Sequence, residues 1–285
     1  IEACRVMTGA PIPIGTEAVI MKEEVLVVDD VVHLNRLPIL NENIRFFGED
    51  IRKDELALFQ GTILKPQSLA LLLALGISEI EVKVLPKIKI IVTGDELVDP
   101  PKPLRFGEVY HLMGPMLSAL IKELGLISSF ERVGDDQKAI ENAINRALDA
   151  DIILLTGGIS MGEHDLVKPA LKNLFVQEIF HKGAWRPGKP LFFGRKEKSL
   201  IFALPGNPVS AFTCFHVFVK PLIARSLGQN YSPKSSILLN DFEKKAGVTN
   251  FVMAVEEENG LKTFDAQGSH RVYGLSKANA LIIAP

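Results

Sequence analysis

The chain has 285 residues, of which 47% are hydrophobic and 23% charged, and its net charge is −2. This composition excludes an intrinsically disordered protein, and the near-neutral balance gives no general attraction to nucleic acid or to an anionic membrane. The longest apolar run, residues 69–75, is far shorter than the ~20 residues that span a bilayer, and the total length favours more than one domain.

The cysteines of the chain indicate its compartment, and its first residue indicates how the sequence was cut. Cys4 and Cys214 are too few for a disulfide framework and lack the paired spacing of a zinc site, so we expect a reducing compartment, the cytoplasm. Cys214 lies among phenylalanines and is expected in the core. The chain starts at Ile1, within a β-type segment and without a methionine, which we interpret as an N-terminal truncation.

The first two segments of the chain are short and varied. Residues 1–45 form a β-rich segment, in which runs at 18–21, 25–28 and 31–34 predict a small antiparallel unit. Residues 46–86 form a connecting α/β segment. Within it, Pro66 opens a helix that Gly76 ends, and residues 79–84 are expected to form a strand.

Residues 87–228 change character, since apolar strand-like runs alternate with amphipathic helices. The runs are residues 88–92, 128–133 and 152–155, and the intervening helices start near Pro115 and at the cap Asp135-Asp136. Such alternation predicts a doubly wound parallel sheet. We therefore expect an α/β multidomain fold, with this central domain flanked by small β domains.

The last part of the chain begins with a predicted hairpin at residues 191–194 and 200–204. A long helix should then run from residue 207 to about 227, and Pro221 should bend it or end it early. Residues 229–285 are expected to form a C-terminal β domain with strands at 237–240, 251–255, 261–264 and 281–283.

A glycine-rich turn follows the predicted strand at residues 152–155. Its glycines and hydroxyl are expected at the carboxyl end of a parallel strand, where doubly wound sheets bind ligands and where backbone N–H groups can approach a phosphate. The residues are Gly157, Gly158, Ser160 and Gly162. A tight structural connection is the alternative.

Acidic residues follow three of the predicted strands and are expected at the same edge of the sheet. They are Asp95, Glu96, Asp135 and Asp165. Carboxylates gathered at one edge repel each other unless a cation is present, and oxygen ligands at a phosphate site suit Mg²⁺. Solvated turns or helix caps are the alternative for each of them.

Two stiff loops complete the predicted site. Lys182, Arg186 and Lys189 surround a Pro-Gly turn that could hold them as anion clamps, and an ordinary solvated basic loop is the alternative. Pro205 and Pro208 flank Asn207 at a strand-to-helix turn. That turn is either a preorganised binding loop or a purely structural connection.

Together these segments resemble one family, the bacterial molybdopterin molybdenumtransferases (MoeA) with the E domain of gephyrin. The order and spacing of the motifs cover nearly the whole chain. The motifs are Met7-Thr8-Gly9-Ala10-Pro11, Gly48-Glu49-Asp50-Ile51, Thr93-Gly94-Asp95-Glu96-Leu97, Gly157-Gly158-Ile159-Ser160-Met161-Gly162-Glu163-His164-Asp165, Pro187-Gly188-Lys189-Pro190, Pro205-Gly206-Asn207-Pro208-Val209-Ser210 and Gln267-Gly268-Ser269-His270.

The resemblance implies an enzyme of molybdenum cofactor biosynthesis. Members of this family take adenylylated molybdopterin from a partner, molybdopterin adenylyltransferase, insert molybdate and release AMP in a Mg²⁺-dependent step. It further implies a homodimer, with residues 87–228 as the molybdopterin-binding domain and with no nucleic-acid or membrane partner. Two alternatives stay open: a molybdopterin adenylyltransferase, which shares the Gly-Gly domain, and a non-enzymatic scaffold like gephyrin.

The resemblance also assigns roles to residues. It implies that Glu96, Asp135 and Asp165 are catalytic and, with Asp95, bind the metal. The substrate-binding residues that it implies are Thr8, Asp50, Gly157, Gly158, Ser160, Gly162, Lys182, Arg186, Lys189, Pro205, Asn207, Pro208 and Ser269.

Three positions depart from the family pattern. The Asp-Gly-Tyr-Ala type motif of the family is expected upstream of Ile1, and Arg186 stands where lysine is commoner. Residues 111–113 replace a small polar residue and an asparagine. We expect His111 to be a satisfied structural side chain rather than a ligand.

Overall fold

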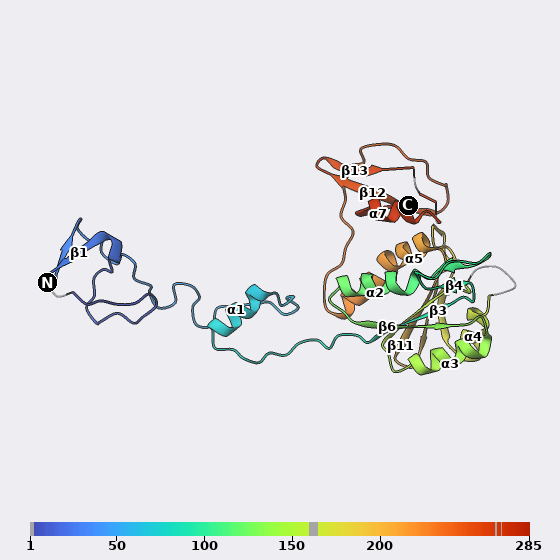
Figure 1. Ribbon diagram of the computed structural model, residues 1–285, viewed down its shortest axis with the longest axis horizontal. Coiled ribbons are helices and arrows are strands. Elements are labelled where there is room, and N and C mark those ends of the chain that lie inside the picture. Colours follow the sequence, from blue (N-terminus) through green and yellow to red (C-terminus); the bar gives the residue numbers. More distant parts are fainter. Residues whose placement is uncertain (1–2, 160–164, 266, 269) are drawn as a thin grey trace. The chain divides into compact units, whose positions relative to one another are not determined.

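The structure is a computed structural model that describes residues 3–159, 165–265, 267–268 and 270–285. The chain divides into two compact units, Ile1–Glu79 and Ile80–Pro285 (Figure 1). In the part of the chain that the structure describes, no helix is both long enough and apolar enough to cross a membrane.

The first unit contains a hairpin and one helix. Strands β1 (Val25–Val28) and β2 (Val31–Leu34) pair antiparallel, directly after a 3₁₀ turn at Lys22–Glu24. Asp29 and Asp30 connect the two strands with φ of 48° and 59°, which is the left-handed geometry of a type I′ turn. Helix α1 (Pro66–Ala74) has proline in its first turn, where the missing N–H leaves no bond unmade.

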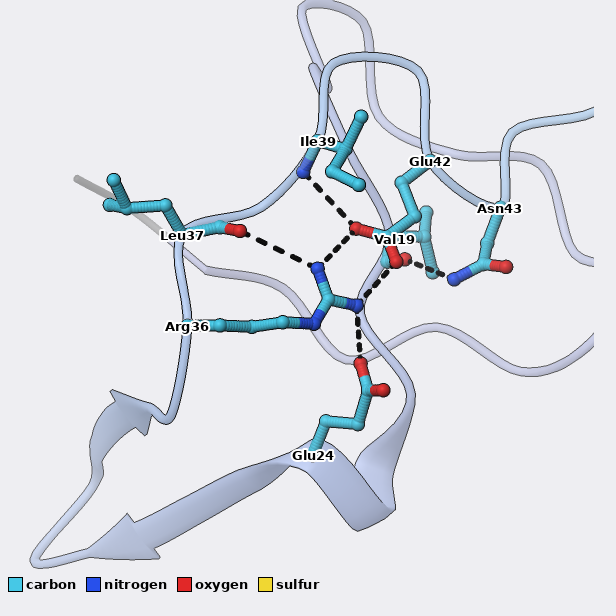
Figure 2. Close-up of polar contacts among 7 residues, drawn as sticks. All are labelled: Val19, Glu24, Arg36, Leu37, Ile39, Glu42 and Asn43. Atoms are coloured by element: carbon cyan, nitrogen blue, oxygen red, sulfur yellow. Dashed lines mark hydrogen bonds and ion pairs between the residues drawn. The ribbon is translucent and has the colours of Figure 1, made fainter.

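Arg36 joins the 3₁₀ turn that precedes the hairpin to the segment that follows the hairpin (Figure 2). Arg36 Nη2 donates to Glu24 Oε2 at 2.6 Å, and Arg36 Nη1 donates to Glu42 Oε2 at 2.9 Å. Arg36 Nη2 also contacts the other oxygen of Glu42, so the guanidinium binds that carboxylate through two nitrogens. These bonds lower the pKa of Glu42 to about 2.

Two predicted strands are not formed. Residues 18–21 are extended, but they bond to the loop after the hairpin: Val19 N donates to Glu42 O, and Asn43 Nδ2 donates to Val19 O. Residues 79–84 are exposed, and no described segment pairs with them; Val84 is 92% exposed. Both predictions rested on apolar composition, and a strand also needs a partner.

The second unit contains a six-stranded sheet in the order β6-β3-β7-β11-β10-β8. The first four strands in this order are parallel, while β10 and β8 run antiparallel to their neighbours. The strands are β3 (Ile88–Thr93), β6 (Ser128–Val133), β7 (Ile152–Thr156), β8 (Gln177–His181), β10 (Phe192–Lys196) and β11 (Ser199–Leu204). The doubly wound sheet and the hairpin β10–β11 are confirmed.

Helices cover both faces of this sheet (Figure 1). Side chains alternate along each strand, so Ile88, Ile90 and Val92 of β3 pack in one core and Ile91 packs in the other. The first core includes side chains of helices α2 (Met113–Glu123), α5 (Pro208–Cys214) and α6 (Lys220–Ser226), and the second those of α3 (Gln137–Ala147) and α4 (Val167–Asn173).

The predicted early end at Pro221 is not observed: helical turns continue to Ser226, and the helix changes type just before Pro221. Helix α5 continues into a π-helical turn, Phe215–Val219, before α6 begins at Lys220 with Pro221 in its first turn. Pro221 has no N–H to donate and its ring crowds the preceding turn, so the ordinary hydrogen-bond ladder cannot run through it. Cys214, at the end of α5, is fully buried as expected.

The C-terminal module (residues 229–285) is a second, smaller sheet. Strands β13 (Gly260–Thr263) and β14 (Ala280–Ala284) flank β12 (Thr249–Glu257), which also pairs with the short strand β9 (Trp185–Arg186). The predicted strand at residues 237–240 is reduced to a single bridge between Leu238 and Leu261. A short helix, α7 (Val272–Lys277), was not predicted.

Candidate functional site

Two aspartates meet where the neighbouring parallel strands β3 and β6 end. The backbone N–H of Asp95 donates to Asp135 Oδ2 at 3.2 Å, and the N–H of Asp135 donates to Asp95 Oδ1 at 3.2 Å. Each carboxylate uses one oxygen in this exchange, and its other oxygen accepts no hydrogen bond from the described residues. Asp136 takes the structural role, because its Oδ1 accepts from Ala139 N at 2.7 Å and caps α3.

The Gly157-Gly158 turn brings the end of β7 against the end of β3. Gly157 has φ of +94°, and a Cβ there would lie 2.5 Å from both Thr93 O and Thr93 Oγ1. Only glycine, which has no Cβ, lets the backbone at this position come so close to Thr93. A Cβ on Gly206 would lie 3.7 Å from Gly157 Cα, so the turn that follows β11 packs here as well. The predicted binding residues Ser160 and Gly162 lie outside the described residues.

The other two predicted acids take separate positions. Glu96 turns back over Gly94, where an added Cβ would lie 2.7 Å from Glu96 Oε2. Asp165 Oδ1 accepts from Lys168 N at 3.5 Å. Among the described residues no three His, Cys, Asp or Glu side chains are placed to hold a metal ion together. Of the four predicted ligands, the structure pairs Asp95 with Asp135.

A basic cavity of about 560 Å³ lies beside β9. All three predicted anion-binding cations, Lys182, Arg186 and Lys189, line it. Gly188 has φ of +95°, and a Cβ there would lie 2.4 Å from Cys214 Sγ, so the turn that carries these cations packs directly on helix α5. Burial raises the pKa of the Cys214 thiol to about 12, which leaves it a neutral core side chain.

Asp165 connects the glycine-rich turn to the basic cavity. Partial burial raises the pKa of its carboxyl, and the nearby ammonium groups of Lys168 and Lys182 oppose that rise. Lys182 lines the cavity and Asp165 follows the glycine-rich segment. Val167 N donates to Gly158 O at 3.4 Å, and Lys168 Nζ lies 3.1 Å from His181 Nδ1, so the start of α4 lies beside both the Gly157-Gly158 turn and the strand that leads to the cavity.

The remaining predicted residues lie at the turn before α5, in the first unit, and outside the described residues. Pro205 is buried, and Asn207 and Pro208 open α5, with Ala211 N donating to Asn207 O at 2.9 Å. Thr8 and Asp50 belong to the first unit. Ser269 lies outside the described residues.

His111 is a satisfied structural side chain, as expected. It is 5% exposed, and it follows the short parallel pair of β4 (Leu97–Val98) and β5 (Val109–Tyr110). Its Nε2 accepts from Gly114 N at 3.2 Å, so the proton is on Nδ1, which lies 3.1 Å from Asp99 Oδ1.

Five residues that line the cavity were not predicted from the sequence, and two of them, Trp185 and Lys245, have polar side-chain groups. Trp185 precedes Arg186, and its Nε1 donates to Gly188 O at 3.0 Å. Lys245 comes from the C-terminal module. No local motif marks Lys245, because it reaches the cavity through the pairing of β9 with β12, and only the position of Trp185 between Lys182 and Arg186 could have suggested a role.

Comparisons with known proteins bear on both units. Residues 1–76 match the family described as MoeA N-terminal region (domain I and II), and residues 89–225 match the one described as Probable molybdopterin binding domain. The chain is 37% identical to a molybdopterin molybdenumtransferase of Haemophilus influenzae, over 99% of the chain and 72% of that relative. It is 33% identical to one of Staphylococcus aureus (strain Mu50), over 89% of the chain and 62% of that relative.

Solved structures agree with these matches. The molybdopterin biosynthesis moeA protein of Pyrococcus horikoshii OT3 aligns with a TM-score of 0.75 at 34% identity, over 98% of this chain and 70% of that one. A molybdenum cofactor biosynthesis protein of Pyrococcus furiosus aligns with a TM-score of 0.64 at 32% identity, over 84% and 76%.

Proposed function

This chain belongs to the family of molybdopterin molybdenumtransferases, enzymes of molybdenum cofactor biosynthesis, and from that premise we propose that it inserts molybdate into adenylylated molybdopterin with Mg²⁺-dependent release of AMP. The observation that carries this proposal is the start of α4, which contacts the Gly157-Gly158 turn through Val167 and contacts His181, the residue before Lys182 of the basic cavity, through Lys168. One ligand could then have a phosphate at the strand ends and further anionic groups among Lys182, Arg186 and Lys189.

The acidic pair fits the chemistry of Mg²⁺. In proteins this ion is usually held by one or two carboxylates, with substrate phosphates and waters as the other ligands. Asp95 and Asp135 each have one oxygen that no described residue uses, and their reciprocal backbone bonds hold both carboxylates at the strand ends. Bound there, Mg²⁺ would neutralise phosphate charge.

The proposed role of each residue follows from its charge or, for the glycines, from its lack of a side chain. Lys182, Arg186 and Lys189 would bind the anionic groups, and Asp165 would hold Lys182 in place between the cavity and the strand ends. Gly157 and Gly158 would let backbone N–H groups approach the phosphate. Thr8, Asp50 and Ser269 stay proposed substrate-binding residues on the family resemblance alone.

The assembly and partner belong to the same proposal. We infer a cytoplasmic homodimer that receives its substrate from molybdopterin adenylyltransferase. The match of residues 1–76 to the MoeA N-terminal region favours this function over an adenylyltransferase, the alternative that the shared Gly-Gly domain raises. Sedimentation velocity at micromolar concentration tests the dimer, and a single monomer boundary would contradict it.

Two adjacent aspartates allow a matched test of the acidic pair. Asp135→Asn removes the charge proposed to hold Mg²⁺, while Asp136→Asn keeps a good helix cap outside the site. We expect AMP release by the Asp135 variant to need at least ~10-fold more Mg²⁺ and the Asp136 variant to stay within ~2-fold of the parent, a tenfold change being about 1.4 kcal/mol. Equal Mg²⁺ curves for the two variants would contradict the assignment.

A further inference from the structure

We propose that Lys245 is an anion-binding residue of the basic cavity and that Asn250 is the positioning residue that holds it there. The C-terminal module would thus supply a fourth cation to a site whose other three come from the central domain. The proposal rests on the proposed function, in which this cavity receives an anionic part of the substrate.

The fold brings the C-terminal module to the cavity through a short parallel ladder. Strand β12 pairs with β9 so that Thr249 lies opposite Trp185 and Asn250 lies opposite Arg186. The backbone N–H of Thr249 donates to Ala184 O at 2.8 Å, which extends the ladder to the turn that carries Lys182. The segment before Thr249 is therefore fixed next to the cations of the central domain.

Asn250 then fixes the backbone of Lys245. Its side chain belongs to a residue that is only 5% exposed, and its Oδ1 accepts from Lys245 N at 3.3 Å. Its Nδ2 donates to Lys245 O at 3.1 Å and to Val248 O at 2.8 Å. Both amide protons and the carbonyl oxygen are in use, so this one side chain closes the loop from Lys245 to Val248.

The positively charged lining of the cavity favours an anionic ligand. Lys182, Arg186, Lys189 and Lys245 line it, and none of its described lining residues is acidic. Asp165 offsets part of the charge of Lys182, and the remaining positive charge around about 560 Å³ favours a polyvalent oxyanion. This volume is within the usual range of small-molecule sites and exceeds what a single oxyanion fills, so the chemistry indicated is a phosphate ester or phosphoanhydride.

The neighbouring lysine provides the matched control. Lys244 Nζ contacts Pro285 O at the end of the chain, and Lys244 is not among the residues that line the cavity. Lys244→Met and Lys245→Met remove the same charge from adjacent positions. Both variants lose one positive charge. A difference in pyrophosphate affinity between them therefore depends on where the charge was removed.

The chain contains one tryptophan, Trp185, and it lines the cavity. Its fluorescence can follow binding of inorganic pyrophosphate, with calorimetry as the second measurement. We expect Lys245→Met to weaken pyrophosphate binding at least ~10-fold at low ionic strength and much less at ~1 M salt, where charges are screened. Lys244→Met should stay within ~2-fold of the parent.

Asn250 is tested by a double-mutant cycle. Asn250→Ala keeps every charge, and we expect it to weaken pyrophosphate binding because Lys245 loses its position. In Lys245→Met/Asn250→Ala the second substitution should add less than ~2-fold, since the two residues act as one unit. Thermal melts show whether each variant is folded. Fully additive effects would remove the positioning role of Asn250 and leave it a purely structural residue.

The outcomes separate this inference from the proposed function. If Lys189→Met weakens pyrophosphate binding and Lys245→Met matches Lys244→Met, the role of Lys245 is wrong and the cavity stays an anion site. If the parent protein does not bind pyrophosphate, the inference fails. If Lys245→Met weakens binding as expected while no AMP is released from adenylylated molybdopterin, the inference holds and the transferase proposal fails.

Discussion

Replacing His216 by phenylalanine should remove a large part of the acid sensitivity of the second unit. His216 lies in the π-helical turn, its ring centroid is 4.3 Å from that of Phe212, and its buried Nε2 has no hydrogen-bond partner among the described residues. Burial, with a contribution from the Lys220 ammonium group, lowers its pKa from 6.5 to about 4.

The sign and the size follow from proton linkage. Because the pKa of His216 is lower in the folded chain, the unfolded chain binds more protons between pH 6.5 and 4. The free energy of unfolding therefore falls as the pH falls through this window, and the stability is fully present above pH 6.5. At 1.36 kcal/mol per pKa unit, this group alone should cost roughly 2 to 3 kcal/mol between pH 7 and pH 4.5.

Urea unfolding followed by Trp185 fluorescence measures this effect locally, since the Trp185 ring packs on Phe218, two residues from His216. Other groups titrate equally in the parent and in His216→Phe. The quantity to compare at each pH is therefore the difference between the free energies of unfolding of the two proteins. That difference should change by roughly 2 to 3 kcal/mol between pH 7 and pH 4.5. A difference that stays constant within ~0.5 kcal/mol would refute the reasoning.

Three further predictions concern the strand ends and the cavity. Glu96→Gln should slow AMP release at least ~10-fold, about 1.4 kcal/mol, with pterin binding retained, and an equal fall in rate and affinity would make Glu96 a positioning residue instead. Lys189→Ala should weaken calorimetric pterin binding by the ~1.5–3 kcal/mol of a charge-assisted hydrogen bond, and unchanged affinity would oppose the anion site. Gly157→Ala should destabilise the second unit by ~2 kcal/mol or more in urea unfolding, because its Cβ would meet Thr93 O at 2.5 Å. Gly125→Ala has similar left-handed φ with open space around it, so it should cost less, and equal losses would contradict the steric argument.

Much of the central domain could be predicted from periodicity. Strand β7 is apolar on both faces, as a strand buried between two helical layers must be, and the structure gives it the expected place in a parallel sheet. The roles of Asp135 and Asp136 could also be predicted in part from the sequence. Capping was expected to occupy one of the two, and Asp136 caps α3 while Asp135 faces Asp95.

The errors arose where tertiary pairing decides the outcome. Residues 79–84 have β-type composition, but no described segment pairs with them. Helix α7 was missed because it is short, contains Gly274 and has no side-chain cap at its start. Lys245 reaches the basic cavity because β12 pairs with β9 across more than sixty residues of sequence, and no local pattern encodes that pairing.

We propose that this chain inserts molybdate into adenylylated molybdopterin, and its two products can be measured separately. The most direct test incubates the protein with adenylylated molybdopterin and Mg²⁺, with and without molybdate, and measures both AMP and the molybdenum bound to the pterin product. We expect AMP release that depends on molybdate, with one molybdenum bound for each AMP released. AMP release at the same rate without molybdate, or a product that carries no molybdenum, would contradict it.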